Sequence, residues 1–129
     1  MKSWLMILSL GLITPQTFAQ NTSPNIEGQW RDNVKGATIL IYQHNGKYFG
    51  KLVAADDPEK HAKIQKQTIL VLEDFEYEED NEYCCGTVYQ PEEDRRLSGT
   101  MELIDANTLE ITGHWGFLSA SREWTRVRT

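Results

Sequence analysis

Two adjacent cysteines, Cys84 and Cys85, are the residues of this sequence best suited to redox chemistry. Neighbouring residues on a strand point to opposite faces of a sheet, and their Cα atoms are about 3.8 Å apart, below the usual range of about 4.4 to 6.8 Å for a disulfide. This geometry disfavours a bridge between the two. Two functional interpretations stay open, a redox-active pair and an intermolecular disulfide that links a dimer. We favour the plainer alternative, in which one cysteine packs as a small hydrophobic residue and the other is exposed without a role.

A run of acidic residues is the second candidate for chemistry. Ten Asp and Glu residues, with no Lys or Arg among them, lie between positions 73 and 94. Calcium needs converging oxygen ligands, and the acids of 73–82 lack the central Gly and terminal Glu of an EF-hand loop. We therefore predict a solvated loop here rather than a metal site, and keep the acidic edge 73–82 as a candidate surface for a partner protein.

The remaining polar residues form no recognisable catalytic arrangement. His44, His61 and His114 follow no recurrent metal-ligand spacing. Ser119 and Ser121 lack the strand and turn context of a nucleophile elbow, and no motif places a pair of carboxylates for acid–base work. We expect no catalytic residue, no metal and no cofactor, and so no enzyme.

The first nineteen residues have the organisation of a signal peptide. Lys2 provides a positive start, residues 4–13 form an apolar run of ten, and Thr17-Phe18-Ala19 ends in a small residue suited to cleavage. A membrane span needs about 20 apolar residues, so this run is too short to be an anchor. The sequence predicts a signal peptide over 1–19 and an exported protein, periplasmic or extracellular, with no membrane span after the signal is removed.

Length and charge constrain the part of the chain after the leader. Of 129 residues, about 110 remain at 20–129, enough for one domain. The formal charge is −6 from 13 basic and 19 acidic residues, and losing Lys2 leaves 12 − 19 = −7. An acidic chain without clustered Lys and Arg is not expected to bind nucleic acid.

Short apolar runs separated by turn residues fill this domain. His44-Asn45-Gly46 is a hairpin turn between two of them, and Asp57-Pro58 favours a short helix or loop near 57–66. Further runs lie at 68–72, 83–89, 97–103, 109–113 and 121–128. About eight strands in consecutive hairpins predict an all-β fold, a small antiparallel up-and-down barrel.

The first and last strands carry residues that suit the closure of such a barrel. Gly28 and Trp30 lie on the first strand, and Trp124 and Arg126 lie on the last. Glycine permits close approach of the backbone, and a guanidinium stacked on an indole gains about 0.5 to 2 kcal/mol. The pattern is similar to that of lipocalin-like, or calycin, barrels.

More closely, the chain resembles a bacterial exported family of no assigned activity, domain-of-unknown-function family 2147. The family usually has Gly near Cys84 and Cys85 and Asp in place of Gln90, so this region departs from its pattern. The resemblance implies a small lipocalin-like barrel and brings no catalytic residues. It rests on motifs in a shared order: Gly28-x-Trp30, Gly50-Lys51-Leu52-Val53, Ile69-Leu70, Gly86-Thr87-Val88-Tyr89-x-Pro91, Leu109-x-Ile111-x-Gly113 and Trp124-Thr-Arg126-Val127.

Two functions compete on these observations. An eight-stranded barrel is either filled by side chains or holds one small ligand, and both states stay open. The first function is a binding module for a small apolar or amphipathic molecule in the cell envelope. The second is a structural or protein-interaction module that uses the edge 73–82 or the two cysteines. The candidate ligand-facing residues of the first are Leu52, Leu97, Met101, Leu103 and Ile111.

Overall fold

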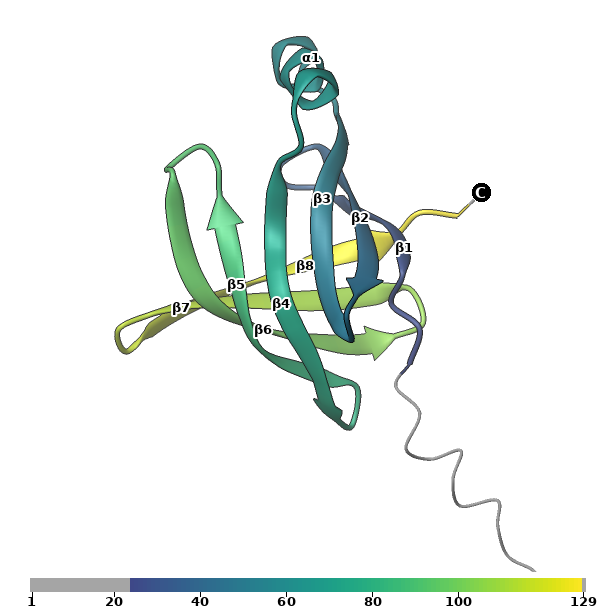
Figure 1. Ribbon diagram of the computed structural model, residues 1–129, viewed down its shortest axis with the longest axis vertical. Helices are drawn as coiled ribbons and strands as arrows, with labels where there is room; N and C mark the ends of the chain where they lie inside the picture. Colours follow the sequence, from purple (N-terminus) through teal and green to yellow (C-terminus); the bar gives the residue numbers. More distant parts are fainter. Residues whose placement is uncertain (1–23, 129) are drawn as a thin grey trace, which may run out of the picture.

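Each strand of the protein pairs antiparallel with the next along the chain (Figure 1). The computed structural model describes residues 24–128, so the predicted signal peptide 1–19 lies outside the described residues. The described elements are β1 (Gly28–Asp32), β2 (Ala37–His44), β3 (Lys47–Ala55), α1 (Pro58–Lys66), β4 (Leu70–Glu79), β5 (Glu82–Gln90), β6 (Arg95–Asp105), β7 (Thr108–Trp115) and β8 (Leu118–Arg126).

The first and last strands close the sheet into a barrel. β1 pairs antiparallel with β8, with Trp30 opposite Arg126 and Arg31 opposite Thr125. These two residue pairs close the barrel, and residues 118–124 of β8 pair with β7 alone. The predicted fold class, an antiparallel up-and-down barrel with one short helix, is confirmed.

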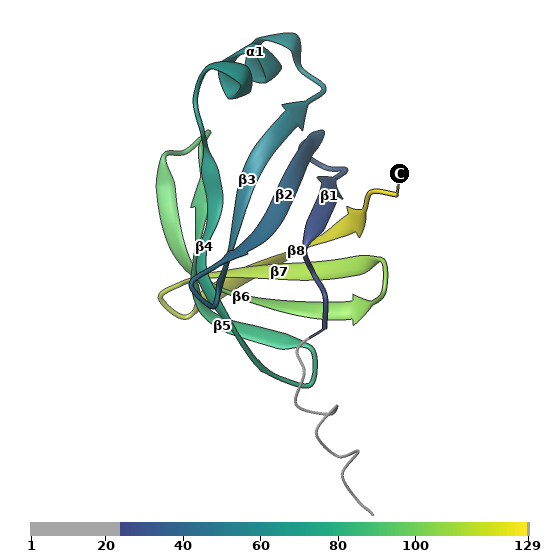
Figure 2. The ribbon, with the colours of Figure 1, turned by 45° about the vertical axis from the view of Figure 1, so that its right-hand side comes forward.

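An up-and-down path places alternate connections at opposite ends of the barrel. The turns β2–β3, β4–β5 and β6–β7 lie at one end, which we call the packed end. The connections β1–β2, β3–β4, β5–β6 and β7–β8 lie at the other, which we call the open end. The helix α1 belongs to the β3–β4 connection and lies beyond the strands at the open end (Figure 2).

Local chemistry explains the tight turns and the start of the helix. Asn45 and Gly46 have φ of 54° and 80°, the left-handed conformations that a two-residue hairpin turn requires. The side chain of Asp57 accepts a hydrogen bond of 3.0 Å from the amide of Lys60, and Pro58 occupies the first helical turn. The hairpin turn and the helix predicted at these positions are confirmed.

The acidic run is a hairpin, and the prediction of a loop is wrong. Residues 73–79 continue β4, and Glu82 begins β5. Phe75 is fully buried and Tyr77 is half-buried. Glu76 and Glu78, which alternate with them along the strand, are exposed to solvent. The two aromatic residues supply the inward face that makes this charged segment a strand.

Two irregularities in this hairpin change which side chains face inward. Asp74 in β4 and Cys85 in β5 have φ of 61° and 71°, and the pairing shifts register beside each of them. Tyr83 and Gly86, three positions apart, therefore both lie inside the barrel. A bulge of this kind interrupts the alternation of side chains between the two faces of a strand. The expectation that Cys84 and Cys85 are not bridged assumed that this alternation is regular.

A row of glycines makes room for one large ring. Gly86, Gly99 and Gly113 lie opposite one another on β5, β6 and β7. A Cβ atom on Gly86 would lie 2.3 Å from the ring of Phe75, and one on Gly99 would lie 3.2 Å from the same ring. The fully buried Phe75 thus occupies volume that side chains at these positions would fill.

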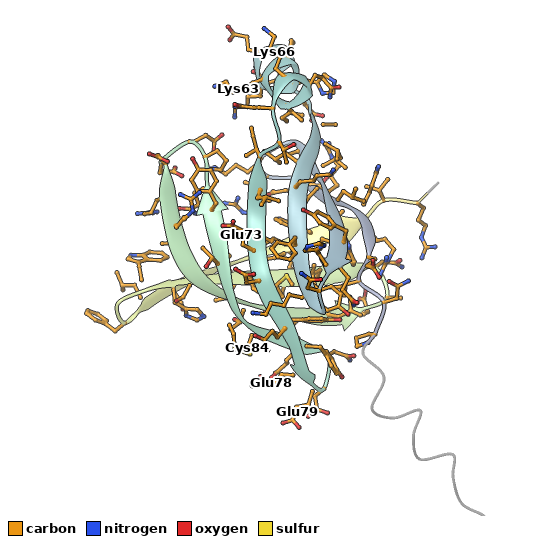
Figure 3. The ribbon with its side chains drawn as sticks, in the orientation of Figure 1. Lys63, Lys66, Glu73, Glu78, Glu79 and Cys84 are labelled. Carbon is orange, nitrogen blue, oxygen red and sulfur yellow. A yellow bond between two sulfur atoms is a disulfide. The ribbon has the colours of Figure 1, made fainter. Side chains whose placement is uncertain are left out.

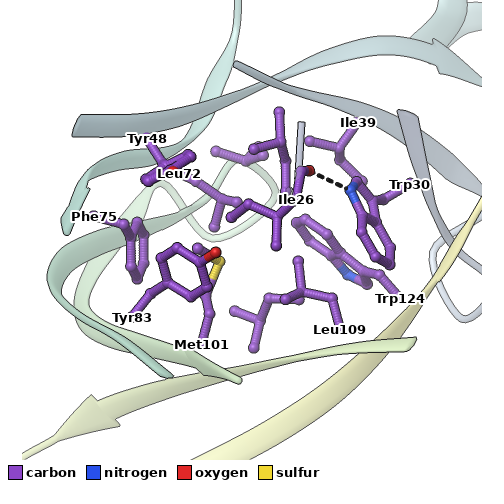
Figure 4. Packing of buried hydrophobic residues seen from close by; sticks show 13 residues of the cluster. Ile26, Trp30, Ile39, Tyr48, Leu72, Phe75, Tyr83, Met101, Leu109 and Trp124 are labelled. Carbon is purple, nitrogen blue, oxygen red and sulfur yellow. Dashed lines mark hydrogen bonds between the residues drawn. The ribbon is translucent and has the colours of Figure 1, made fainter. Parts of the chain in front are cut away.

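The packed end is filled by a hydrophobic cluster (Figure 4). The indole Nε1 of Trp30 donates to the carbonyl of Ile26 at 2.9 Å, and Tyr48 and Tyr83 contact edge to face with 5.2 Å between ring centroids. The hydroxyl of Tyr83 donates to the carbonyl of Pro24 at 3.0 Å, and burial raises the pKa of this hydroxyl. The residues that precede β1 therefore lie across this end and cover it.

Candidate functional site

A cavity of about 310 Å³ occupies the open end of the barrel. It falls at the lower limit of the range of about 300 to 1,000 Å³ that is typical of small-molecule sites. Its apolar wall combines residues of strands β2 to β8 with one buried residue of α1 and one residue directly before β4. These are Ile39, Leu52, Ile64, Ile69, Val71, Val88, Leu97, Ile111 and Trp124.

The distribution of side-chain size explains why one half of the barrel is hollow. The packed end contains Trp30, Phe75 and Tyr83, which are the largest fully buried side chains. The wall of the cavity instead includes four of the smallest residues, which leave space unfilled. These are Ala37, Ala55, Gly113 and Ala120.

The five candidate ligand-facing residues divide between the two ends. Leu52, Leu97 and Ile111 line the cavity. Met101 is 2% exposed within the hydrophobic cluster, and Leu103 packs against that cluster. Met101 and Leu103 therefore contribute to the packed end instead of the cavity wall.

An arginine faces into the cavity and pairs with a buried carboxylate. Arg122 shares its face of β8 with Trp124, and its Nη1 donates to Oδ2 of Asp32 at 3.2 Å. The other oxygen of Asp32 accepts from the amides of Val34 and Lys35, both at 3.0 Å. Asp32 therefore holds the β1–β2 turn and neutralises part of the Arg122 charge. The ion pair joins residues ninety positions apart, so no local pattern in the sequence indicates it.

The indole N–H of Trp124 has no acceptor in the described chain. Trp124 is 6% exposed and lines the cavity, and its indole Nε1 is buried with no hydrogen-bond partner among residues 24–128. An indole N–H can only donate, and a buried donor without an acceptor is unfavourable. Trp124 thus contributes ring surface to the cavity wall two residues from Arg122, whereas its N–H is enclosed within the protein.

One carboxylate joins three segments around the mouth of the cavity. Glu92 in the β5–β6 turn forms ion pairs with Lys35 of the β1–β2 turn and with Lys60 of α1, the latter at 2.5 Å. Hydrogen bonds from these two ammonium groups lower the pKa of Glu92 to about 2. The same contact raises the pKa of Lys60. Glu92 therefore connects the helix to two neighbouring turns.

Replacing Glu92 with Gln is expected to make stability less dependent on pH. The pKa of Glu92 is lower in the folded protein than its ordinary value of 4.5, so its contribution is present above that value and is lost as the pH falls toward 2. Because the pairs are partly exposed, Glu92→Gln should lower Tm at pH 7 by roughly 2 to 5 °C. Thermal unfolding followed by circular dichroism between pH 7 and 2 measures this difference, which should vanish at the acidic limit.

The neighbouring residue supplies a matched control for this measurement. Glu93 is exposed and has no ion pair within the described part of the chain. Glu93→Gln should leave Tm and its pH dependence close to those of the unsubstituted protein. If Glu92→Gln and Glu93→Gln changed Tm equally, the ion pairs of Glu92 would make no specific contribution to stability.

The two cysteines are joined to each other, contrary to the expectation of unpaired thiols. Cys84 and Cys85 form a disulfide with their Cα atoms 3.7 Å apart. The bulge explains the difference, because the positive φ of Cys85 removes the alternation that would separate neighbouring side chains. Cys84 is half-buried and Cys85 is exposed on the outer wall, and neither lines the cavity. Both sulfur atoms are used within one chain, so no thiol is left for a link to a second chain.

The histidines lie apart from one another and from the Arg122 pair. Nδ1 of His61 accepts from the amide of Ala55 at 3.3 Å, and His114 lies 3.5 Å from the hydroxyl of Thr100. His44 contacts the side chain of Asn45 in the β2–β3 turn. Within residues 24–128, no group of three or more His, Cys, Asp or Glu side chains is arranged to hold a metal ion.

The four residues assigned to barrel closure meet at the junction of β1 and β8. The guanidinium of Arg126 lies 4.4 Å from the centroid of the Trp30 ring and donates to the carbonyls of Ala106 and Asn25 at 2.8 and 3.0 Å. Gly28 has φ of 124°, and a Cβ atom there would lie 3.8 Å from Arg126. Trp124 lies two residues before Arg126, on the inner face of β8.

Comparisons with known proteins agree with this architecture. Residues 28–126 match a family described as uncharacterized protein conserved in bacteria (DUF2147). Protein HP1028 from the human pathogen Helicobacter pylori, described as belonging to the lipocalin family, superposes with a TM-score of 0.63 at 17% identity, covering 83% of this chain and 85% of that one. No curated protein matches the sequence. In the described part of the chain, no helix has the length and apolar character needed to cross a membrane.

Proposed function

The chain belongs to the DUF2147 family of bacterial proteins, and we propose that it is an exported, non-catalytic lipocalin-like protein that binds a small apolar or amphipathic molecule in the cell envelope. The hollow open end of the barrel carries this proposal. A cavity of about 310 Å³ with a mostly apolar wall suits a ligand whose burial removes apolar surface from water. The likeness to a lipocalin-family protein supports the barrel that such a site requires.

The geometry of the lumen favours binding over a purely structural role. Had Trp30, Trp115 and Phe49 filled the lumen, the barrel would have been a packed scaffold. Instead Trp30 lies in the packed end, Trp115 is 37% exposed at the mouth, and Phe49 stacks on Tyr42 outside the wall with 5.9 Å between ring centroids. The open end is therefore left free to accept a molecule.

A neutral fluorescent probe tests the proposed cavity. N-phenyl-1-naphthylamine gains fluorescence in apolar surroundings, and we expect it to bind the purified protein with one molecule per barrel. Leu52 lines the cavity on β3, so Leu52→Trp should fill part of the space and weaken probe binding by roughly tenfold or more. Fluorescence titration measures both affinities.

A matched substitution on the outer wall controls for the added indole. Leu40 lies on β2 opposite Lys51 and alternates with the inward residues Ile39 and Ile41. Leu40→Trp should therefore leave the affinity for the probe unchanged. No binding to the unsubstituted protein, or equal loss in the two variants, would overturn the proposed function.

The leader residues support the proposal of export. Lys2, the apolar run 4–13 and the Thr17-Phe18-Ala19 sequence have the three parts of a cleavable signal. We expect the mature protein to begin at Gln20 and to be recovered from the periplasm or the medium. N-terminal sequencing of protein from each fraction tests this, and an intact N-terminus in the cytoplasmic fraction would contradict it.

A further inference from the structure

The charge of the cavity lining is opposite to that of the whole chain. The chain has a net charge of −6, yet four cationic and two anionic side chains line the cavity, which gives 4 − 2 = +2. Local charge of one sign inside a low-dielectric cleft favours ligands of the other sign. The charged lining residues are Lys35, Lys60, Lys63, Arg122, Asp32 and Glu92.

Part of this positive charge is not used within the protein. Lys35 and Lys60 share the carboxylate of Glu92, whereas Lys63 has no ion-pair partner among residues 24–128. A guanidinium has five N–H donors, and the described contacts of Arg122 use one of them, on Asp32. Arg122 therefore retains donors for a ligand beside the carboxylate that holds it in place.

The indole of Trp124 lies beside Arg122 on the same wall. Arg122 and Trp124 are two positions apart on β8, so both side chains project from the inner face of one strand. Both line the cavity, although the Nε1 of Trp124 is enclosed within the protein. A ligand oxygen that accepts from Arg122 would neutralise the guanidinium, with the apolar ring of Trp124 next to it.

The acidic hairpin does not oppose an anion at this position. Glu78 and Glu79 lie at the β4–β5 turn, at the packed end, whereas Lys63 and Lys66 lie on α1 at the open end (Figure 3). Charges separated by more than a Debye length, about 8 Å at physiological ionic strength, are largely screened from each other. The carboxylates of the β4–β5 turn thus lie at the end opposite the cavity, and the charged lining of the cavity itself has a positive excess.

We infer that the ligand is an anionic amphiphile, with an oxyanion bound by Arg122 and an apolar body against the wall formed by Leu52, Leu97 and Val88. This inference rests on the proposed function, because it names the class of ligand for the same cavity. Carboxylate, sulfonate and phosphate groups share the required chemistry, since each presents charged acceptor oxygens to N–H donors.

Two dyes that differ by a single sulfonate test the anionic group. N-phenyl-1-naphthylamine is neutral, and 8-anilinonaphthalene-1-sulfonate adds one negative charge to the same ring system. Arg122→Gln should weaken binding of the sulfonate by roughly tenfold or more and of the neutral dye by less than about threefold. Lys63 lines the cavity and has no ion pair among residues 24–128, so Lys63→Gln should weaken the sulfonate selectively by about threefold.

Three controls make the comparison specific. Arg96 lies on the outer wall of β6, 4.4 Å above the Tyr89 ring, so Arg96→Gln removes the same charge outside the cavity and should change neither affinity. Leu52→Trp should weaken both dyes, which excludes binding of the sulfonate elsewhere on the surface. Retained affinity of Arg122→Gln for the neutral dye shows that this variant has folded. If Arg122→Gln does not fold, Lys63→Gln provides the test.

The possible outcomes separate the two proposals. Selective loss of the sulfonate in Arg122→Gln or Lys63→Gln supports the anionic ligand. Equal losses of both dyes, or no loss of the sulfonate, would overturn the inference and leave the apolar cavity standing. Binding of the sulfonate alone would limit the cavity to amphiphiles that carry an anionic group, and failure of both dyes to bind the unsubstituted protein would overturn the proposed function itself.

Discussion

Replacing Trp30 with Ala is expected to lower the free energy of unfolding by about 3 to 5 kcal/mol, the range typical of removing a large buried aromatic side chain. Trp30 is fully buried, and it lies where β1 meets β8. A domain of this size is stable by about 5 to 15 kcal/mol, so the loss is a large part of the total. Urea unfolding followed by far-ultraviolet circular dichroism measures it.

The size of this effect arises from three roles of one side chain. The indole fills the packed end beside Ile26, donates to the Ile26 carbonyl, and lies under the guanidinium of Arg126. Without the ring, a cavity remains and the residues before β1 lose one of their attachments to the barrel. Trp30→Phe keeps most of the volume but leaves the carbonyl of Ile26 without its donor, and should cost about 1 to 3 kcal/mol.

A tryptophan at the mouth provides the comparison. Trp115 is 37% exposed and lies near the guanidinium of Arg95, 5.4 Å from the ring centroid. Trp115→Ala should lower the free energy of unfolding by less than about 1 kcal/mol, since exposed cation–π contacts contribute about 0.5 to 1 kcal/mol. If Trp30→Ala were as mild as Trp115→Ala, the packed end would not be the source of stability.

The barrel itself could be predicted because its strands obey local rules. β6 and β7 alternate inward and outward residues without interruption from Leu97 to Met101 and from Leu109 to Gly113. Asn45 and Gly46 mark the β2–β3 turn, and Asp57 with Pro58 marks the start of α1. Each of these signals lies within a few residues of the feature it predicts.

The hairpin of β4 and β5 could not be predicted in the same way. Asp74 and Cys85 adopt positive φ, which is uncommon for residues other than glycine and changes the face of every later residue in the strand. The neighbouring strands stabilise these conformations, since the register shifts occur opposite β3 and β6. A pattern read within one strand contains no information about these partners.

The sequence also could not predict which inward-facing residues line the cavity and which belong to the packed end. Leu97 and Met101 lie on the same face of β6, four residues and about 13 Å apart along the strand. One lines the cavity and the other belongs to the packed cluster. Alternation predicts the face of a side chain but not its height in the barrel, which depends on the size of residues on other strands. The pairing of Arg122 with Asp32 depends on closure in the same way.

Replacing Gly86 with Ala is expected to lower the free energy of unfolding by about 1 to 3 kcal/mol because of overpacking. The added Cβ would lie 2.3 Å from the ring of Phe75, which is fully buried and has little space to move. Gly86 is not among the residues with positive φ, so the cost comes from the contact and not from the backbone. Urea unfolding of the variant measures the loss.

A double-mutant cycle identifies the contact responsible. Phe75→Leu alone removes part of the core and destabilises the protein, but it also frees the space that a methyl at Gly86 needs. The combination should therefore be more stable than the sum of the two single effects predicts, by about 1 kcal/mol or more. Gly46→Ala is the matched control, because Gly46 has φ of 80° with no atom within 4 Å of a Cβ, and its cost should simply add to that of Phe75→Leu.

The same cycle tests whether the two ends of the barrel are independent. Phe75 and Gly86 belong to the packed end and do not line the cavity. The double variant should therefore bind N-phenyl-1-naphthylamine with nearly unchanged affinity despite its altered core. Additive effects on stability would contradict the assigned contact, and a large change in affinity would show that packing at Phe75 and Gly86 also shapes the cavity.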